Sequence, residues 1–277
     1  MMNSVDVFHL GPQKAGTAWI YSAFQEHPEI YCMPQRDSVH YFDMNYHRGE
    51  EWYLNHFAAR TSEKTTVDAT YSYIRSVAAP RRIYDHNPGA KLIVCLRNPI
   101  DRAFSHYWHG KKKRDFEFSF EEGLRKYDLY SSWIETGFYA DHIERYLNYF
   151  SREQLLVTWF EDLNNNTHKF ASEIFSFMEV DSSYIPSHIE SKVNVAGAKV
   201  IGGKKVHNLI RTARRKTPIP HRYLRPLRIG YEKLSNLYYS EHREGINEET
   251  RKVLRDIYAP EISRLEALLA VDLSEWK

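Results

Sequence analysis

The chain contains little cysteine: Cys32 and Cys95 are the only two among 277 residues. Small secreted domains that depend on a disulfide framework carry several cysteine pairs, so that class is excluded. Both cysteines stand in apolar runs that are typical of strands. We therefore expect two reduced core side chains, as in a cytoplasmic protein.

Long apolar runs are also missing. The sequence has no stretch of about 18 consecutive apolar residues, the length that a helix needs to cross a bilayer. An apolar, strand-like run begins within a few residues of Met1, which leaves no room for a signal peptide. We expect a soluble protein with a cytoplasmic location.

The net charge is small, +2, but it is unevenly distributed. Residues 203–228 carry nine Lys or Arg and no Asp or Glu, so the rest of the chain carries a net charge of −7. Pro218 and Pro220 interrupt any helix around them, so we expect a short basic helix over 204–216 and then an extended elbow. We interpret residues 199–231 as a basic, lid-like segment that makes weak contact with a polyanion or a membrane surface, with no nucleic acid as partner. A solvated basic surface is the alternative.

The overall composition favours a folded domain. Hydrophobic residues make up 42% and charged residues 27%, which excludes disordered and fibrous classes. Short apolar runs alternate with helical patterns, which indicates β-α-β units. We predict an α/β protein with a P-loop-like three-layer fold, in which helices flank a central, mainly parallel sheet, as one domain over residues 1–277. The predicted strands are 5–10, 30–33, 66–69, 91–96 and 154–158, and the predicted helices are 17–26, 50–58, 100–110, 139–150, 165–178 and 248–269.

Residues 8–20, FHLGPQKAGTAWI, are typical of a phosphate-binding loop between a strand and a helix. Gly11 and Gly16 allow a tight turn, and the helix N-terminus presents backbone N–H groups to an anion. The sequence G-K-[ST] of nucleotide triphosphatases is absent, because Lys14 lies between the glycines and Thr17-Ala18 follows them. Without a hydroxyl at position 18 the usual magnesium ligand is missing, so we expect transfer from a nucleotide without a metal. A tight turn with a solvated lysine is the alternative.

A second strand-turn-helix segment, LIVCLRNPIDRAFSHYWH, covers residues 92–109. Arg97 follows the predicted strand at its carboxyl end, where open α/β sheets bind ligands. Arg102, Ser105 and His109 share one face of the helix that follows. Arg97 and Ser105 suit a second phosphate, since a planar guanidinium grips two oxygens and a hydroxyl a third. A solvated helix face is the alternative.

Together, the two segments resemble those of sulfotransferases that use 3′-phosphoadenosine 5′-phosphosulfate (PAPS). More narrowly, the chain looks like the heparan sulfate group, especially the N-sulfotransferase domain. The similarity covers residues 8 to about 180 and about the last 30. It is carried by GPQKAGTAWIYSAFQEHPEI, NYHRGEEWYLNHF, RNPIDRAFSHYWH, GFYADHIERYLNYF and DLSEW.

The resemblance implies transfer of a sulfuryl group from PAPS to a hydroxyl or amine of an acceptor, such as a glycan or a small metabolite. The product of the donor would be adenosine 3′,5′-bisphosphate (PAP), and no metal is implied. Lys14 would stabilise the leaving group, and Arg97 with Ser105 would hold the 3′-phosphate. His109 would contact the acceptor. The donor-binding residues implied in this way are Lys14, Ala15, Gly16, Thr17, Ala18, Trp19, Arg97 and Ser105.

The sequence departs from the resemblance at the general base. Heparan sulfate enzymes carry a glutamate shortly before an aromatic pair, but QRDSVHYFD places Ser38 at that position. Asp37 and His40 flank it, and Asp68 in the predicted third strand is a further candidate; these three are the predicted bases. Two other functions stay open: a small-molecule kinase with the same loop architecture, and an inactive relative that binds polyanions.

Overall fold

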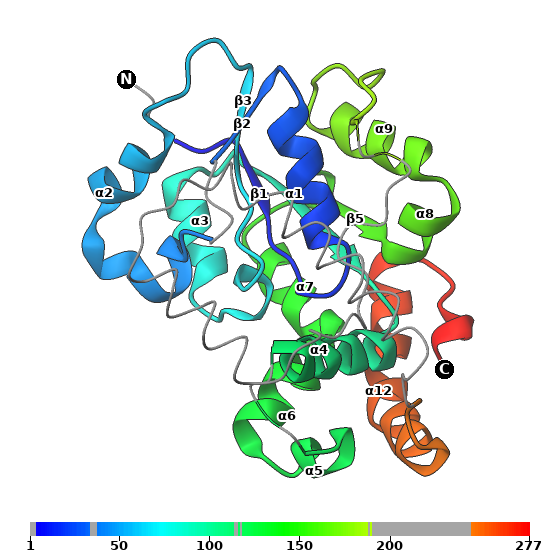
Figure 1. Ribbon diagram of the computed structural model, residues 1–277. Coiled ribbons are helices and arrows are strands. Elements are labelled where there is room, and N and C mark those ends of the chain that lie inside the picture. The colour runs from blue at the N-terminus through cyan, green and yellow to red at the C-terminus, as the bar shows by residue number, and fades with distance from the viewer. Residues whose placement is uncertain (1–3, 34–37, 114–115, 117, 188, 190–244) are drawn as a thin grey trace, which may run out of the picture.

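The computed structural model describes residues 4–33, 38–113, 116, 118–187, 189 and 245–277. Within these residues a five-stranded sheet has the order β2-β3-β1-β4-β5, and neighbouring strands in it are parallel (Figure 1). The strands are β1 Val7–His9, β2 Ile30–Cys32, β3 Thr65–Asp68, β4 Lys91–Leu96 and β5 Leu155–Trp159. The predicted α/β class with a central parallel sheet is therefore confirmed.

Helices cover both faces of this sheet. They are α1 Thr17–Glu26, α2 Glu50–Leu54, α3 Ala79–His86, α4 Pro99–Lys113, α5 Phe120–Leu124, α6 Tyr127–Trp133, α7 Tyr139–Leu147, α8 Phe160–Asn165, α9 Thr167–Phe177 and α12 Glu248–Leu269. A π-helix spans Tyr41–Asn45, and short 3-10 helices span Tyr46–Arg48, Asn55–Phe57, Tyr73–Arg75, Glu135–Gly137, Arg152–Gln154 and Ser274–Trp276.

The alternation of side chains along the strands divides the core in two. Val7 of β1 and Ile93 of β4 face α1 and α9, where Phe24 and Ile174 lie. Phe8 lies in the other cluster, which packs residues of α3, α4, α7 and α12 against the sheet. Every residue of β1 to β3 is buried, as expected for a parallel sheet covered on both faces.

The strand order determines where a ligand can enter. β1 lies between β3 and β4, and the chain leaves β1 toward β2 but leaves β4 toward β5. The loops after β1 and β4 therefore separate to opposite sides at neighbouring strand ends. Such a topological switch point is where open α/β sheets form their ligand crevice.

Several predicted bounds agree with the structure and others need correction. The predicted helices 17–26 and 248–269 and the strand 91–96 coincide with α1, α12 and β4. The predicted helix 50–58 is α2 followed by a 3-10 turn, and 165–178 begins at the last residue of α8 and otherwise coincides closely with α9. Helices α3, α5, α6 and most of α8 are additional, and α5, α6 and α8 are too short to give a clear periodic pattern.

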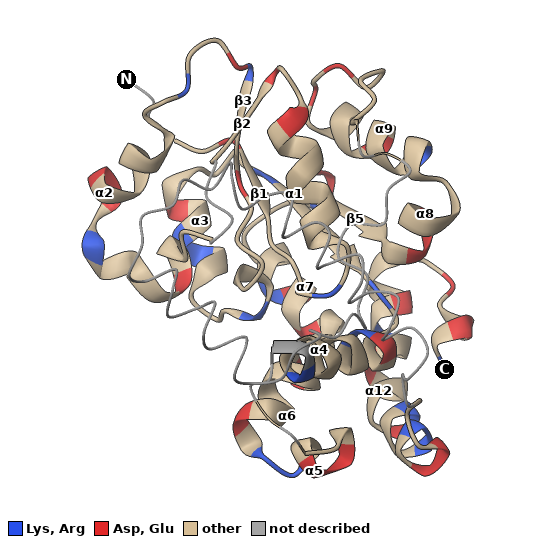
Figure 2. Cartoon of the chain, viewed as in Figure 1, with Lys and Arg blue, Asp and Glu red and all other residues tan. Residues whose placement is uncertain are grey.

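Cys32 and Cys95 are buried and free, as predicted. In the described ranges, no helix combines the length and apolar character required to cross a membrane. Charged residues are frequent along outer helices such as α5 and α12 (Figure 2). The basic segment 203–228, the lid-like range 199–231 and the helix predicted at 204–216 lie outside the described residues.

Candidate active site

The turn after β1 has an unusual backbone. Gly11, Lys14 and Gly16 have φ angles of 100°, 74° and 77°, in the left-handed region that L-residues seldom adopt. A Cβ on Gly11 would stand 2.1 Å from the Tyr71 carbonyl oxygen, and one on Gly16 would stand 2.9 Å from Leu163. Gly11 is therefore required sterically and Gly16 is favoured by its left-handed backbone, while the lysine is held in a strained conformation of the kind often found at functional sites.

Helix α1 continues directly from this turn and favours an anion at its start. Its N-cap is Gly16, which brings no side chain, and its first turn has no acidic residue. The N–H groups of the first helical turn lack intrahelical partners, and the helix dipole is positive at this end. Thr17 is the first helical residue and is half-buried. The turn and the helix together form a cradle that suits a phosphate.

The other predicted residues of this segment lie at the surface of the loop or beneath it. Lys14 and Ala18 are half-buried, whereas Ala15 is fully buried. Trp19 is buried on α1, and its ring meets the Phe170 ring edge-on at 5.8 Å. The indole thus braces the loop against α9.

Arg97, directly after β4, reaches across to the same loop. Its Nη1 donates a hydrogen bond to the Lys14 carbonyl at 3.2 Å, and its guanidinium carbon lies 4.5 Å from the centre of the Phe160 ring. The Tyr139 hydroxyl donates to the Arg97 carbonyl at 2.9 Å. Arg97 is therefore fixed at both ends, with its guanidinium plane next to the loop.

Helix α4 begins just beyond Arg97. The Asn98 side-chain oxygen accepts from the Ile100 N–H at 3.0 Å and so caps the helix. Ser105 is buried on this helix. Arg102, which the sequence groups on the same face, is fully buried, and its Nη2 donates to the Trp133 carbonyl. This face of α4 therefore packs against α6, and the alternative of a solvated face is wrong for Arg102.

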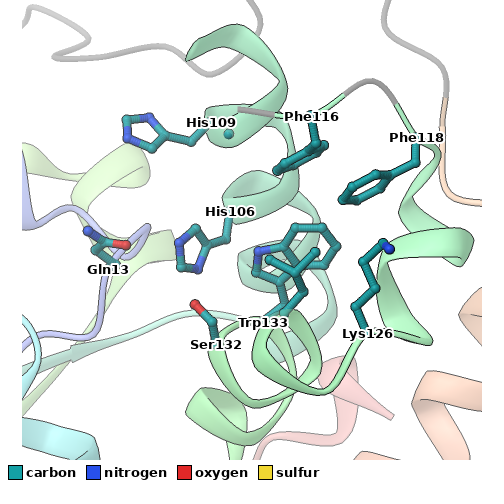
Figure 3. Close-up of a pocket in the computed structure, with 10 residues that line it drawn as sticks. Gln13, His106, His109, Phe116, Phe118, Lys126, Ser132 and Trp133 are labelled. Atoms are coloured by element: carbon teal, nitrogen blue, oxygen red, sulfur yellow. The ribbon is translucent and has the colours of Figure 1, made fainter. Parts of the chain in front are cut away.

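A cavity of about 510 Å³ opens beside the loop. Its size is in the range of small-molecule sites. Figure 3 shows His106 and His109 of α4 on the side of Gln13, with the aromatic rings on the other side. The lining residues are Gln13, His106, His109, Gly110, Phe116, Phe118, Lys126, Leu129, Ser132 and Trp133.

The cavity has an aromatic wall and a polar wall. Phe116 and Phe118 stack with ring centres 4.4 Å apart, and Trp133 lies 5.6 Å from Phe116. Such faces suit a flat ring or the apolar face of a sugar. Polar groups gather at the loop side, where Lys14 follows Gln13 in the chain. Sequence reasoning did not find this cavity, although His106 and His109, three residues apart on α4, were a signal that could have suggested it.

Of the three predicted bases, Asp68 lies at the end of β3 and is fully buried. Its carboxylate accepts hydrogen bonds from the Tyr53, Tyr73 and Thr70 hydroxyls at 2.9, 3.0 and 2.6 Å. Burial raises the pKa of Asp68, although these three donors oppose the shift. The Tyr73 oxygen also accepts from the backbone of Tyr41. Through Tyr73, the Asp68 carboxylate therefore helps to hold the segment around Tyr41 in place.

His40 is the second predicted base, and it belongs to a small hydrogen-bonded cluster. Its Nδ1 lies 2.9 Å from the Ser72 hydroxyl and 3.3 Å from the Asp43 carboxylate, and Ser72 donates to the same carboxylate. Burial would raise the pKa of Asp43, but the hydrogen bonds from His40 and Ser72 outweigh it and lower that pKa. Asp43 and Ser72 line a second cavity of about 340 Å³.

Two further residues of this segment, Ser38 and Asp37, stand in the sequence at or beside the position of the general base. Ser38 donates to the Ala69 carbonyl at 3.3 Å. Asp37 lies outside the described residues. Among the residues that are described, no group of three or more His, Cys, Asp or Glu is placed to hold a metal ion.

Comparison with known proteins identifies relatives of this arrangement. The profile of the sulfotransferase domain family matches residues 4–215. The bifunctional heparan sulfate N-deacetylase/N-sulfotransferase 4 of Mus musculus is 30% identical over 273 residues, which is 91% of this chain and 30% of the relative. The heparan sulfate glucosamine 3-O-sulfotransferase 6 of Homo sapiens is 28% identical over 239 residues, 83% of this chain and 69% of the relative. The chain thus spans less than a third of the first of these proteins.

A solved structure agrees in fold over nearly the whole length. A sulfotransferase from Alicyclobacillus acidocaldarius has a TM-score of 0.72 and 24% identity, with 99% of both chains covered. At that identity the likeness concerns the fold alone. Together with the profile match, it confirms the predicted family resemblance at the level of sequence and of architecture.

Proposed function

The chain belongs to the sulfotransferase domain family, and we propose that it transfers a sulfuryl group from PAPS to a hydroxyl or amine of an acceptor. The observation that carries this proposal is the link between Arg97 and Lys14. This hydrogen bond connects the loop after β1 with the residue after β4, and each of these suits a phosphate. PAPS carries one phosphate on the 5′ side of its ribose and another at the 3′ position, so it requires two such sites next to each other.

The residues around the loop fit such a donor. Gly11 and Gly16 allow the left-handed turn that forms the loop, and the start of α1 offers N–H groups to the 5′-phosphosulfate. Thr17, the backbone of Ala15–Ala18 and Trp19 would complete that side. Arg97 and Ser105 would bind the 3′-phosphate, because a guanidinium fork and a hydroxyl match its oxygens.

The chemistry that this chain supplies is positioning and charge stabilisation. The donor, when bound, supplies the sulfuryl group and a phosphate leaving group. Lys14 would stand at the bridging oxygen and stabilise the negative charge that gathers there as the S–O bond breaks. The acceptor's oxygen or nitrogen would form the new bond to sulfur in line with the leaving group and lose its proton to a base.

The cavity beside Lys14 is the place proposed for the acceptor. His109 lines it together with Gln13, which supports the predicted role of His109 in acceptor binding. The relatives named above act on heparan sulfate by their names, so we include a saccharide among the proposed acceptors. The aromatic wall supports a ring-bearing acceptor of either kind.

Incubation with radiolabelled PAPS tests this function and separates it from the alternatives. The acceptors would be a heparan sulfate chain with free amino groups, glucosamine and 2-naphthol, and parallel reactions would contain ATP and magnesium. Transfer of label from PAPS with release of PAP supports the proposal. Transfer from ATP alone would establish a kinase, and binding of PAP and heparin without any transfer would establish an inactive relative.

A further inference from the structure

His106 occupies a position that no predicted role explains. It lies on α4 next to Ser105, and its ring forms part of the cavity wall with Gln13 and His109. In Figure 3 the ring stands between Gln13 and Ser132. Lys14, the residue after Gln13, is close enough for its charge to act on this imidazole. His106 therefore lies where the cavity meets the loop.

The hydrogen bonds of His106 fix where its proton is. The Ser132 backbone acts on the ring as a hydrogen-bond acceptor, since it favours the protonated form, and Nδ1 is a buried atom with no partner among the described residues. The bond to Ser132 consequently uses Nε2, and a carbonyl can only accept, so Nε2 carries the hydrogen. Nδ1 is left with a lone pair. A buried polar atom without a partner is costly, and one beside a cavity calls for a ligand that satisfies it.

We propose that His106 is the general base of this enzyme, and that its Nδ1 accepts the proton of the acceptor's hydroxyl or amine in the cavity beside Lys14. This inference rests on the proposed sulfuryl transfer. The acceptor's O–H or N–H bond breaks and an N–H bond forms at Nδ1. The acceptor's electron pair forms the new bond to sulfur, and the electrons of the broken S–O bond leave with PAP. His106 then returns the proton to solvent.

The charges around His106 keep it neutral before the donor arrives. Burial lowers the pKa of His106 well below its usual value, and the charges of Arg102 and Lys14 and the nearby imidazole of His109 lower it further. Arg102 and His109 belong to α4 and Lys14 to the loop, while α6 contributes the Ser132 carbonyl, which opposes the shift. A neutral imidazole is the form that can accept a proton.

Binding of the donor would make this imidazole a stronger base. Lys14 would then be paired with a phosphate, and the negative charges of the donor would stabilise an imidazolium close by. The pKa of His106 would rise, so proton transfer would become easier only when the sulfuryl group is present. This coupling would favour reaction only after the donor is in place.

The two predicted bases that the structure describes, Asp68 and His40, fit this role less well. The Asp68 carboxylate accepts three hydroxyl hydrogen bonds in the core. His40 is engaged at Nδ1 by Asp43 and Ser72, and neither of these partners lines the cavity that contains Gln13. His106 lines that cavity and retains a lone pair on Nδ1.

The first test is an NMR titration that needs no acceptor. Histidine-labelled protein would be titrated between pH 4 and 9, alone and saturated with PAP, and the His106 signal would be assigned by its loss in His106→Gln. We expect the ring in the protein alone to become protonated only at a pH well below that of an ordinary histidine, and its pKa to rise when PAP is bound. An unchanged or lower pKa with PAP would overturn the coupling. Failure of PAP to bind would instead contradict the proposed function.

The second test measures kcat of the variants with heparan sulfate, glucosamine or 2-naphthol as the acceptor. If the protein sulfates none of these, the rate of PAPS hydrolysis by water is measured instead. His106→Gln should lower kcat at least about 100-fold with little change in PAP affinity. The control is His168→Gln, which alters an exposed histidine of α9 and should keep wild-type rates. Wild-type kcat in a folded His106→Gln protein would refute the role of His106 while leaving sulfuryl transfer intact.

Discussion

The guanidinium group of Arg97 donates a hydrogen bond from Nη1 to the backbone carbonyl of Lys14, at an N–O distance of 3.2 Å. Residue 97 follows β4, whereas residue 14 belongs to the turn after β1. The same bond therefore supports the left-handed conformation of Lys14 and holds the guanidinium beside the loop, where the proposed function places a phosphate. Substitutions at these two positions should affect different properties of the enzyme.

Arg97→Lys should weaken PAP binding about 10- to 100-fold. Lysine keeps the positive charge but loses the planar fork and the contact with the Lys14 carbonyl, and a hydrogen bond to a charged group contributes about 1.5–3 kcal/mol. Isothermal titration calorimetry with PAP measures the loss. Titration with AMP, which has no 3′-phosphate, provides the control and should give nearly equal affinities for both proteins. An equal loss for AMP would argue against Arg97 as the 3′-phosphate ligand.

Lys14→Ala should reduce turnover at least about 100-fold and change PAP affinity much less. The lysine acts on charge that develops at the bridging oxygen, and removal of one such group commonly costs two to three orders of magnitude in kcat. Steady-state rates and PAP titrations separate the two effects. Lys169→Ala, at an exposed position of α9, is the matched control. Turnover equal to that of the wild type would refute the role of Lys14.

Gly11→Ala should destabilise the fold by more than about 2 kcal/mol, since strain at a special backbone position is among the costly classes of substitution. The new Cβ would stand 2.1 Å from the Tyr71 oxygen, at a φ angle of +100°. Urea denaturation gives the free energy of unfolding. Gly245→Ala meets nothing within 4 Å and should change stability little. Equal stabilities of the two variants would contradict the steric account.

Asp68→Asn should lower stability by about 1–3 kcal/mol but retain turnover within a few-fold in the folded protein. The amide leaves some of the Tyr53, Tyr73 and Thr70 hydroxyls without their buried acceptor. Thermal unfolding and kcat at a temperature below the transition provide the two measurements. Loss of kcat by two orders of magnitude in a stable protein would restore Asp68 as a candidate base.

His9 should make the fold sensitive to acid. Burial lowers the pKa of His9 in β1 to about 4, so the unfolded chain binds a proton more readily than the folded protein between pH 6.5 and 4. The free energy of unfolding should therefore fall by up to about 3 kcal/mol over that range as the pH decreases. His9→Leu should remove the part of this pH dependence that comes from His9. The pKa of His142 is also about 4, and the contribution of His142 to the pH dependence should be the same in the variant and the wild type.

Urea unfolding at pH 7 and pH 5 measures the His9 effect. The free energy of unfolding of His9→Leu minus that of the wild type should be larger at pH 5 than at pH 7. His168→Gln, at an exposed site, should follow the wild type at both values. Parallel pH dependence of the wild type and His9→Leu would show that His9 does not carry the shift.

The parts of the fold that could be predicted depend on contiguous signals. The apolar run before Arg97 and the proline after it define β4 and the start of α4, and both were foreseen. Helices α5 and α6 have five and seven residues, too few for a clear periodic pattern. The π-helix over Tyr41–Asn45 depends on hydrogen bonds that the Tyr73 hydroxyl accepts from the Tyr41 and Phe42 N–H groups, and it has no local signature.

The candidate site also has a part that the sequence predicts and a part that it does not. Lys14, Thr17 and Arg97 were foreseen because each belongs to a short motif with a known physical use. The cavity was not, because it joins Gln13 to α4 and to residues 116–133, and that meeting is a product of tertiary packing. The importance of His106 follows from its neighbours, which the sequence alone does not reveal.

The cavity walls have a consequence for how this scaffold can change. Apart from Gln13, the lining residues come from one stretch between His106 and Trp133, while most of the proposed donor contacts come from the ends of β1 and β4. Under the proposed function, acceptor choice and donor use are therefore encoded in largely separable pieces of chain. Exchange of residues 116–133 alone would graft a new acceptor preference onto an unchanged donor site, by natural recombination or by design.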